Sequence, residues 1–102
     1  LQLSTKFSQN FGQKLENLVF NVLNQNNENL TYLRDNYEID FYTNKTLYQV
    51  SYKMDDEKTL NREINSFKYF NEDKTKESKI ITLNESKNID NIEVISIDEF
   101  IL

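Results

Sequence analysis

The sequence predicts one small α/β domain: a small mixed sheet with flanking helices, in the order helix, three strands, helix, two strands (α-β-β-β-α-β-β). Apolar residues recur at helical spacing in two segments, and apolar and polar residues alternate in the short segments between them. A chain of 102 residues can build one sheet with a helix on each side, but not a second core. We therefore treat residues 1–102 as a single domain.

The two helices are marked by their apolar faces and their ends. The first is expected from about Phe7 to Leu23, and the polar run 24–29 ends it. Its apolar residues lie three or four positions apart on one face: Phe11, Leu15, Leu18, Val19 and Val22. The second helix is expected to start at the acidic run 55–57 and to end near Phe70, because acidic residues suit a helix N-terminus.

Five strands are expected from the remaining apolar segments, at residues 30–34, 37–42, 47–53, 79–83 and 92–97. In the second of them, Tyr37, Ile39 and Phe41 alternate with polar residues and are predicted to share one face. The run 43–45 is a tight turn, so the second and third strands are predicted to form a hairpin. Asp98 is expected to cap a last helical turn at residues 99–102.

The composition excludes several kinds of chemistry. The chain has no His and no Cys, so it has no Ser-His-Asp triad, disulfide or thiolate zinc site. A single glycine, Gly12, excludes a P-loop and a dinucleotide-binding fingerprint. Carboxylates, amides, hydroxyls and lysines remain, and the metals that suit such groups are Mg²⁺ and Mn²⁺. The absence of Cys fits a cytoplasmic protein, and no apolar run approaches the ~18 residues of a membrane span.

The charge and the start of the chain bear on its partners. A formal net charge of −5 disfavours general nucleic-acid binding, unless lysine and arginine gather locally. The chain begins at Leu1 rather than at a methionine, which suggests that it is cut from a longer protein.

The predicted hairpin brings the most informative polar residues together. Asp40 lies on one strand and Gln49 and Ser51 on the next, so pairing of the two strands places them on one side of the sheet. Glu16, beside the apolar face of the first helix, is expected to point at the same place. The alternative readings are structural. Asp40 and Glu16 are then buried polar or solvated residues, Gln49 and Ser51 form the solvent face of a strand, and Lys53 is its charged end.

Five segments in this order resemble a known group of proteins. They are Gly12 to Phe20, which resembles a GxxxENxVxxxL helix, then Tyr32-Leu33-Arg34, Glu38-Ile39-Asp40-Phe41, Tyr48-Gln49-Val50-Ser51-Tyr52, and Asp56 to Ile64. Together they are similar to the C-terminal domain of unknown function of bacterial and archaeal AAA-type ATPases, within the PD-(D/E)XK, restriction-endonuclease-like superfamily. The resemblance covers about residues 11–102. It implies that an ATPase module of the same polypeptide precedes this domain.

The resemblance also implies the positions of an ancestral nuclease site. Glu16, Asp40 and Gln49 occupy the places of the metal ligands that hold Mg²⁺ or Mn²⁺ in active members, where a lysine orients the attacking water. Here Gln49-Val50-Ser51 stands where active members have acid-x-Lys, and Lys53, two residues further along, is the candidate for a migrated lysine. Two carboxylates without the adjacent lysine imply a catalytically degenerate site.

Three functions remain open from the sequence. The first is a nuclease-fold accessory domain of an ATPase, without catalysis, that serves in DNA engagement, assembly or regulation. The second is an active Mg²⁺-dependent DNA nuclease. The third is a protein–protein interaction domain without a role on nucleic acid. No membrane partner is expected from any of them.

Overall fold

The computed structural model describes residues 2–26, 29–52 and 56–102, with side chains from Phe11 onward. The described elements are α1 (Gln2–Asn26), β1 (Thr31–Arg34), β2 (Glu38–Thr43), β3 (Thr46–Val50), α2 (Glu57–Phe70), β4 (Glu77–Thr82), β5 (Lys87–Ile89), β6 (Ile92–Ser96) and α3 (Ile97–Ile101). The predicted α/β class, with a mixed sheet and flanking helices, is confirmed. Within these ranges, no helix is long and apolar enough to cross a membrane.

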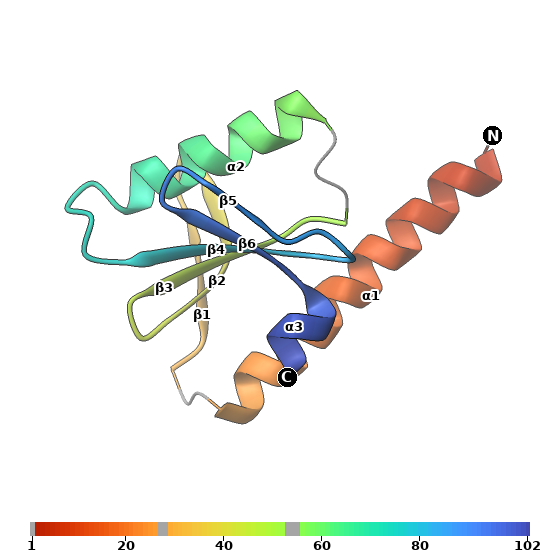
Figure 1. Ribbon diagram of the computed structural model, residues 1–102, viewed down its shortest axis with the longest axis horizontal. Coiled ribbons are helices and arrows are strands. Elements are labelled where there is room, and N and C mark those ends of the chain that lie inside the picture. Colours follow the sequence, from red (N-terminus) through yellow and green to blue (C-terminus); the bar gives the residue numbers. More distant parts are fainter. Residues whose placement is uncertain (1, 27–28, 53–55) are drawn as a thin grey trace.

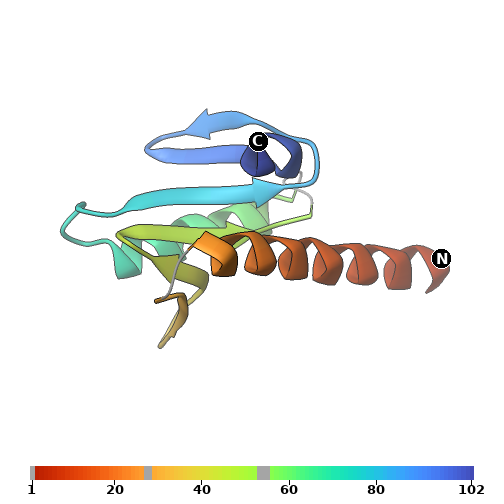
Figure 2. The ribbon, with the colours of Figure 1, turned by 90° about the horizontal axis from the view of Figure 1, so that it is seen from below.

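The strands form one six-stranded sheet in the order β1-β2-β3-β4-β6-β5, which Figure 2 shows from one edge to the other. The first three strands are joined as antiparallel neighbours. Strand β4 then pairs parallel to both β3 and β6, and β5 returns antiparallel along the outer edge of β6. Helix α2 makes the crossover from β3 to β4, because parallel neighbours cannot be joined by a tight turn.

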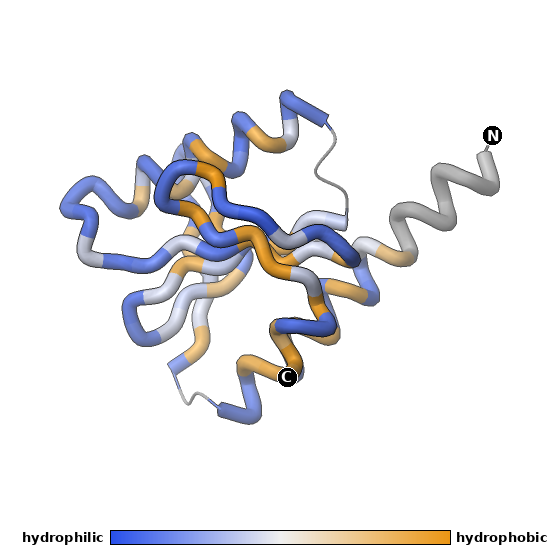
Figure 3. The backbone as a smooth tube through the Cα atoms, viewed as in Figure 1, coloured by the Kyte–Doolittle hydropathy of each residue, from blue (hydrophilic) through white to orange (hydrophobic). Residues whose placement is uncertain are grey.

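The sheet separates two apolar clusters, one covered by α2 and the other by α1 and α3 (Figure 1). The cluster beneath α2 is built from Ile39, Leu47, Phe67, Ile80, Ile92 and Val94. The cluster beneath α1 and α3 is built from Leu15, Val19, Leu23, Phe41, Ile81 and Ile97. In Figure 3 the turns at the sheet ends are mostly hydrophilic, in contrast to the strands and helices that supply the two clusters.

Local sequence accounts for how several elements begin. Asp56 is the N-cap of α2, where its carboxylate accepts from the backbone N–H of Lys58 at 3.0 Å and from the hydroxyl of Thr59 at 3.2 Å. The β2–β3 hairpin turns on Asn44 and Lys45, which both have positive φ, at 47° and 70°. Two consecutive residues of positive φ are the pattern of a type I′ turn, whose twist matches that of the flanking strands.

Several sequence-based predictions need correction. The predicted order omitted β5, because this three-residue strand is mostly polar and pairs on one side only. Helix α3 begins after Ser96, which caps it through a bond from the N–H of Glu99, so Asp98 is not the cap. The predicted apolar face of α1 was too wide, since Leu18 is 40% exposed. Helix α1 also extends past both of its predicted ends, to Gln2 and Asn26.

Strand β2 carries a β-bulge, which overturns the predicted sharing of one face by Ile39 and Phe41. Thr31 of β1 pairs with Tyr42, but Leu33, two residues later, pairs with Ile39, three residues back along β2. The extra residue on β2 reverses the alternation of its side chains. Ile39 therefore packs beneath α2 and Phe41 beneath α1.

Candidate functional site

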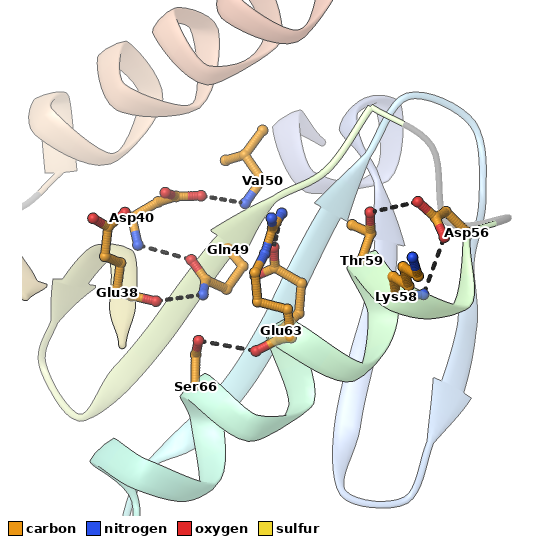
Figure 4. A network of polar contacts seen from close by, with 10 residues as sticks. Glu38, Asp40, Gln49, Val50, Asp56, Lys58, Thr59, Glu63 and Ser66 are labelled. Carbon is orange, nitrogen blue, oxygen red and sulfur yellow. Dashed lines mark hydrogen bonds and ion pairs between the residues drawn. The ribbon is translucent and has the colours of Figure 1, made fainter. Parts of the chain in front are cut away.

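The bulge leaves backbone groups at the end of the β2–β3 ladder to be paired by side chains. The regular pairing of these strands runs from Thr43–Thr46 to Phe41–Tyr48. At the next position, the backbone N–H of Val50 donates to Oδ2 of Asp40 at 2.8 Å. The Asp40 carboxylate thus takes the place of a strand carbonyl, as Figure 4 shows.

The side chain of Gln49, on β3, bonds the backbone of β2, just as the side chain of Asp40, on β2, bonds the backbone of β3. Its Oε1 accepts from the backbone N–H of Asp40 at 2.8 Å, and its Nε2 donates to the carbonyl of Glu38 at 2.7 Å (Figure 4). The side chain is buried, with 3% of the residue exposed, so the alternative that placed it on a solvent face is wrong. A buried amide needs partners for its donor and its acceptor, and both are found here on the bulged backbone of β2.

Glu63 of α2 is the residue that the sequence analysis missed. It is 7% exposed, its Oε1 lies 3.6 Å from the guanidinium of Arg62, and its Oε2 has no hydrogen-bond partner in the structure. A usable signal existed: Glu63 lies three residues after Leu60 and four before Phe67, which places it on the buried face.

These side chains line a cleft of about 550 Å³ between α1, β2 and α2. Its acidic residues come from three elements, which are Glu16 on α1, Glu38 and Asp40 on β2, and Glu63 on α2. Glu16 is exposed, Asp40 is half-buried and Glu63 is buried, so the acidity extends from the surface to the floor. The structure therefore brings three predicted site residues, Glu16, Asp40 and Gln49, to one cleft.

Burial raises the pKa values of the two inner carboxyls. Desolvation raises the pKa of Asp40 to about 6, opposed by the bond from Val50 and assisted by the negative charges of Glu16 and Glu38. Desolvation raises the pKa of Glu63 to about 7, and the charge of Asp40 adds to the effect. The guanidinium of Arg62 opposes both shifts without cancelling them.

The other two predicted positions contribute less. Ser51 is 7% exposed rather than on a solvent face, and its backbone N–H donates to the carbonyl of Ile81 at 2.9 Å, which extends the β3–β4 pairing. Lys53, the candidate for a migrated lysine, lies outside the described residues.

The expected ligands leave few free oxygen atoms for a divalent metal ion. Across the described part of the chain, no three acidic side chains lie close enough together to hold one. Mg²⁺ demands near-octahedral oxygen ligation. The side-chain oxygen Oε1 of Gln49 and the carboxylate oxygen Oδ2 of Asp40 already accept hydrogen bonds from backbone N–H groups. The cleft thus provides carboxylates at several depths rather than a closed cage of oxygen ligands.

Comparison with known proteins gives one informative result. The chain is 39% identical, over 107 aligned residues, to an uncharacterized protein of Methanocaldococcus jannaschii. The alignment covers 94% of this chain but 23% of that protein, so the chain spans about a quarter of its relative's length. No family model and no solved structure matches the chain.

Proposed function

We propose that this chain is a catalytically degenerate accessory domain of the PD-(D/E)XK, restriction-endonuclease-like fold. It acts by binding rather than by cleavage, within a larger cytoplasmic ATPase. The candidate site has become part of the scaffold and of a binding cleft, and its activity as a nuclease has been lost.

The engagement of Gln49 carries this proposal. Both polar atoms of its amide bond the backbone of β2, and Oδ2 of Asp40 bonds the backbone of β3. The two positions that would ligate a metal therefore join the ends of two strands. Hydrolysis by a metal-generated hydroxide needs ligands that are free to hold the ion, with an open position for water. The chemistry available in the cleft does not meet that need.

The ATPase context rests on the order of the five segments from Gly12 to Ile64, and the length of the archaeal relative supports it. A domain of this size that aligns with a quarter of a longer chain is suited to be one module of a larger protein. The sequence upstream of this region in its natural chain tests the context directly. A Walker A motif is expected there, and a polypeptide without any nucleotide-binding motif would contradict the ATPase assignment.

A nuclease assay tests the degenerate character of the site. We expect no cleavage of single- or double-stranded DNA by the domain in Mg²⁺ or Mn²⁺. Asp40→Ala and Lys53→Ala serve as site variants, and Asp90→Asn, in the exposed β5–β6 turn, serves as the matched control. Metal-dependent cleavage that Asp40→Ala abolishes and Asp90→Asn retains would establish an active nuclease and refute the proposal.

A salt titration separates a DNA-binding module from one that binds only protein. Neutralised phosphates release counterions, so the logarithm of a DNA affinity falls steeply with the logarithm of the salt concentration. A steep slope in a fluorescence-anisotropy titration with labelled DNA would assign the domain to DNA engagement. No binding at low salt would leave assembly or regulation through protein contacts as its role.

A further inference from the structure

The charges that line the cleft are unbalanced. Four carboxylates face one guanidinium of the lining, that of Arg62, whose own side chain is 70% exposed. Glu38 has a separate partner at the rim, because Arg34 lies 2.8 Å from its Oε1. Among the described side chains, no lysine or arginine forms an ion pair with Glu16 or Asp40. The cleft therefore has an excess of negative charge.

The floor of the cleft holds a buried acceptor without a donor. The side chain of Glu63 is 9% exposed, and its Oε2 has no partner in the structure. A buried carboxylate oxygen that accepts no hydrogen bond costs free energy, which a bound donor would recover. Its ion-pair partner, Arg62, stands 3.6 Å from the other oxygen, beyond ordinary hydrogen-bonding distance. The unmet need at this position is for a donor that also carries positive charge.

The shape and charge of the cleft select among cations. Its volume of about 550 Å³ matches pockets that enclose an organic group, which range over ~300–1,000 Å³. A single metal ion would leave most of it empty. Nucleic acid is disfavoured inside the cleft, because its phosphates would meet Asp40 and Glu16 without an intervening cation. A long side chain with a charged tip matches the arrangement, since its head can reach Glu63 while the rim acids attract it from solvent.

We propose that this cleft receives an arginine or lysine side chain from a basic segment of a partner protein. The head group donates to Glu63 and Asp40, and Glu16 at the rim faces a neighbouring basic residue of the same segment. Tyr37, also in the lining and 37% exposed, offers an aromatic surface to the stem or to the cation. This inference names the partner chemistry for the proposed binding role, yet it can fail while the nuclease assay still supports that role.

An NMR titration of the isotopically labelled chain tests the proposal. The probe is an acetylated, amidated pentapeptide, Gly-Ala-Arg-Ala-Gly, and its control carries citrulline, which keeps the shape of arginine but has no charge. We expect the arginine peptide to shift the backbone amides of Asp40, Val50 and Glu63. The citrulline peptide should bind at least about tenfold more weakly, because charge-assisted bonds are the strong ones. Equal shifts from both peptides, or none in the cleft, would overturn the proposal.

Variants of the chain complete the test. Glu63→Gln keeps the size of the floor residue and should weaken the arginine peptide by about tenfold. Glu77→Gln removes the same charge from an exposed position at the start of β4 and should change affinity less than about twofold. Asp40→Asn replaces Glu63→Gln if the latter does not fold. An equal loss of affinity for the arginine peptide in Glu77→Gln would show that the net charge of the chain alone attracts the peptide, and it would refute a specific site. Saturable cleft shifts with MgCl₂ alone at submillimolar concentration would refute it in favour of a metal.

Discussion

The buried carboxyl of Glu63 should make the stability of the domain fall as the pH rises. Its pKa is raised from 4.5 to about 7 in the folded chain, chiefly by desolvation. Below pH 4.5 both states hold the proton, and the group adds no pH dependence. Between these values the unfolded chain is ionised while the folded chain keeps its proton, so folding is progressively less favoured. Above pH 7 the full difference applies, and it amounts to about 3 kcal/mol.

The substitution Glu63→Gln removes this dependence. We expect the stability of the variant, relative to the unmodified chain, to rise by about 3 kcal/mol between pH 4.5 and pH 8.5. Urea denaturation followed by circular dichroism at several pH values measures it. The buried amide of the variant leaves an unpaired donor, which lowers its stability by about 1–3 kcal/mol at every pH, so the slope is the decisive quantity. Exposed Glu77→Gln is the control and should parallel the unmodified chain. If the free energy of unfolding of Glu63→Gln changed with pH in parallel with that of the unmodified chain, the argument from burial of Glu63 would be refuted.

Four further changes test other parts of the structure by the same denaturation assay. Gln49→Ala removes two bonds that hold the bulge, so it should destabilise the fold by about 2–4 kcal/mol, and a loss below 1 kcal/mol would contradict the joining role. Leu47→Ala opens a cavity at a fully buried position, with an expected loss of about 2–5 kcal/mol, whereas an unchanged midpoint would contradict its burial. Asp56→Ala should cost about 1 kcal/mol through the lost N-cap of α2, and no loss would argue against that cap. Lys45→Gly should stabilise the hairpin by about 1 kcal/mol by relieving a positive φ, and a destabilised variant would show that this turn carries no strain.

The class of the fold followed from the sequence because its main elements have strong local signals. Apolar spacing in α2 and the apolar pattern of the strands were enough to place α2, β1, β2, β3, β4 and β6 within about three residues of their observed bounds. The strand β5 gave no such signal, since Lys87-Asn88-Ile89 has one apolar residue and is held by pairing with β6 alone. This pairing depends on the neighbouring strand β6, and the pattern of residues 87–89 taken alone does not record it.

The candidate site could be predicted only in part, for a similar reason. Asp40 and Gln49 were expected to meet, because pairing of adjacent strands requires it once a hairpin forms. Their bonds to the strand backbone were not predicted, because these depend on a bulge, and no residue type in β2 marks the residue that a bulge adds. Gln49 was expected as a metal ligand or, in the alternative, on the solvent face, and neither expectation included a side chain that pairs the unpaired backbone groups of β2 in the interior.

Because of the bulge, β2 contributes buried side chains to both apolar clusters. Ile39 and Phe41 lie two residues apart, yet one packs under α2 and the other under α1. Inserting one more residue between them would turn one of the two to the other face of the sheet, and removing Asp40 would lose the bond that joins β2 to Val50 of β3. Homologous chains should therefore tolerate insertions in the β5–β6 turn far better than any change of length between residues 38 and 43.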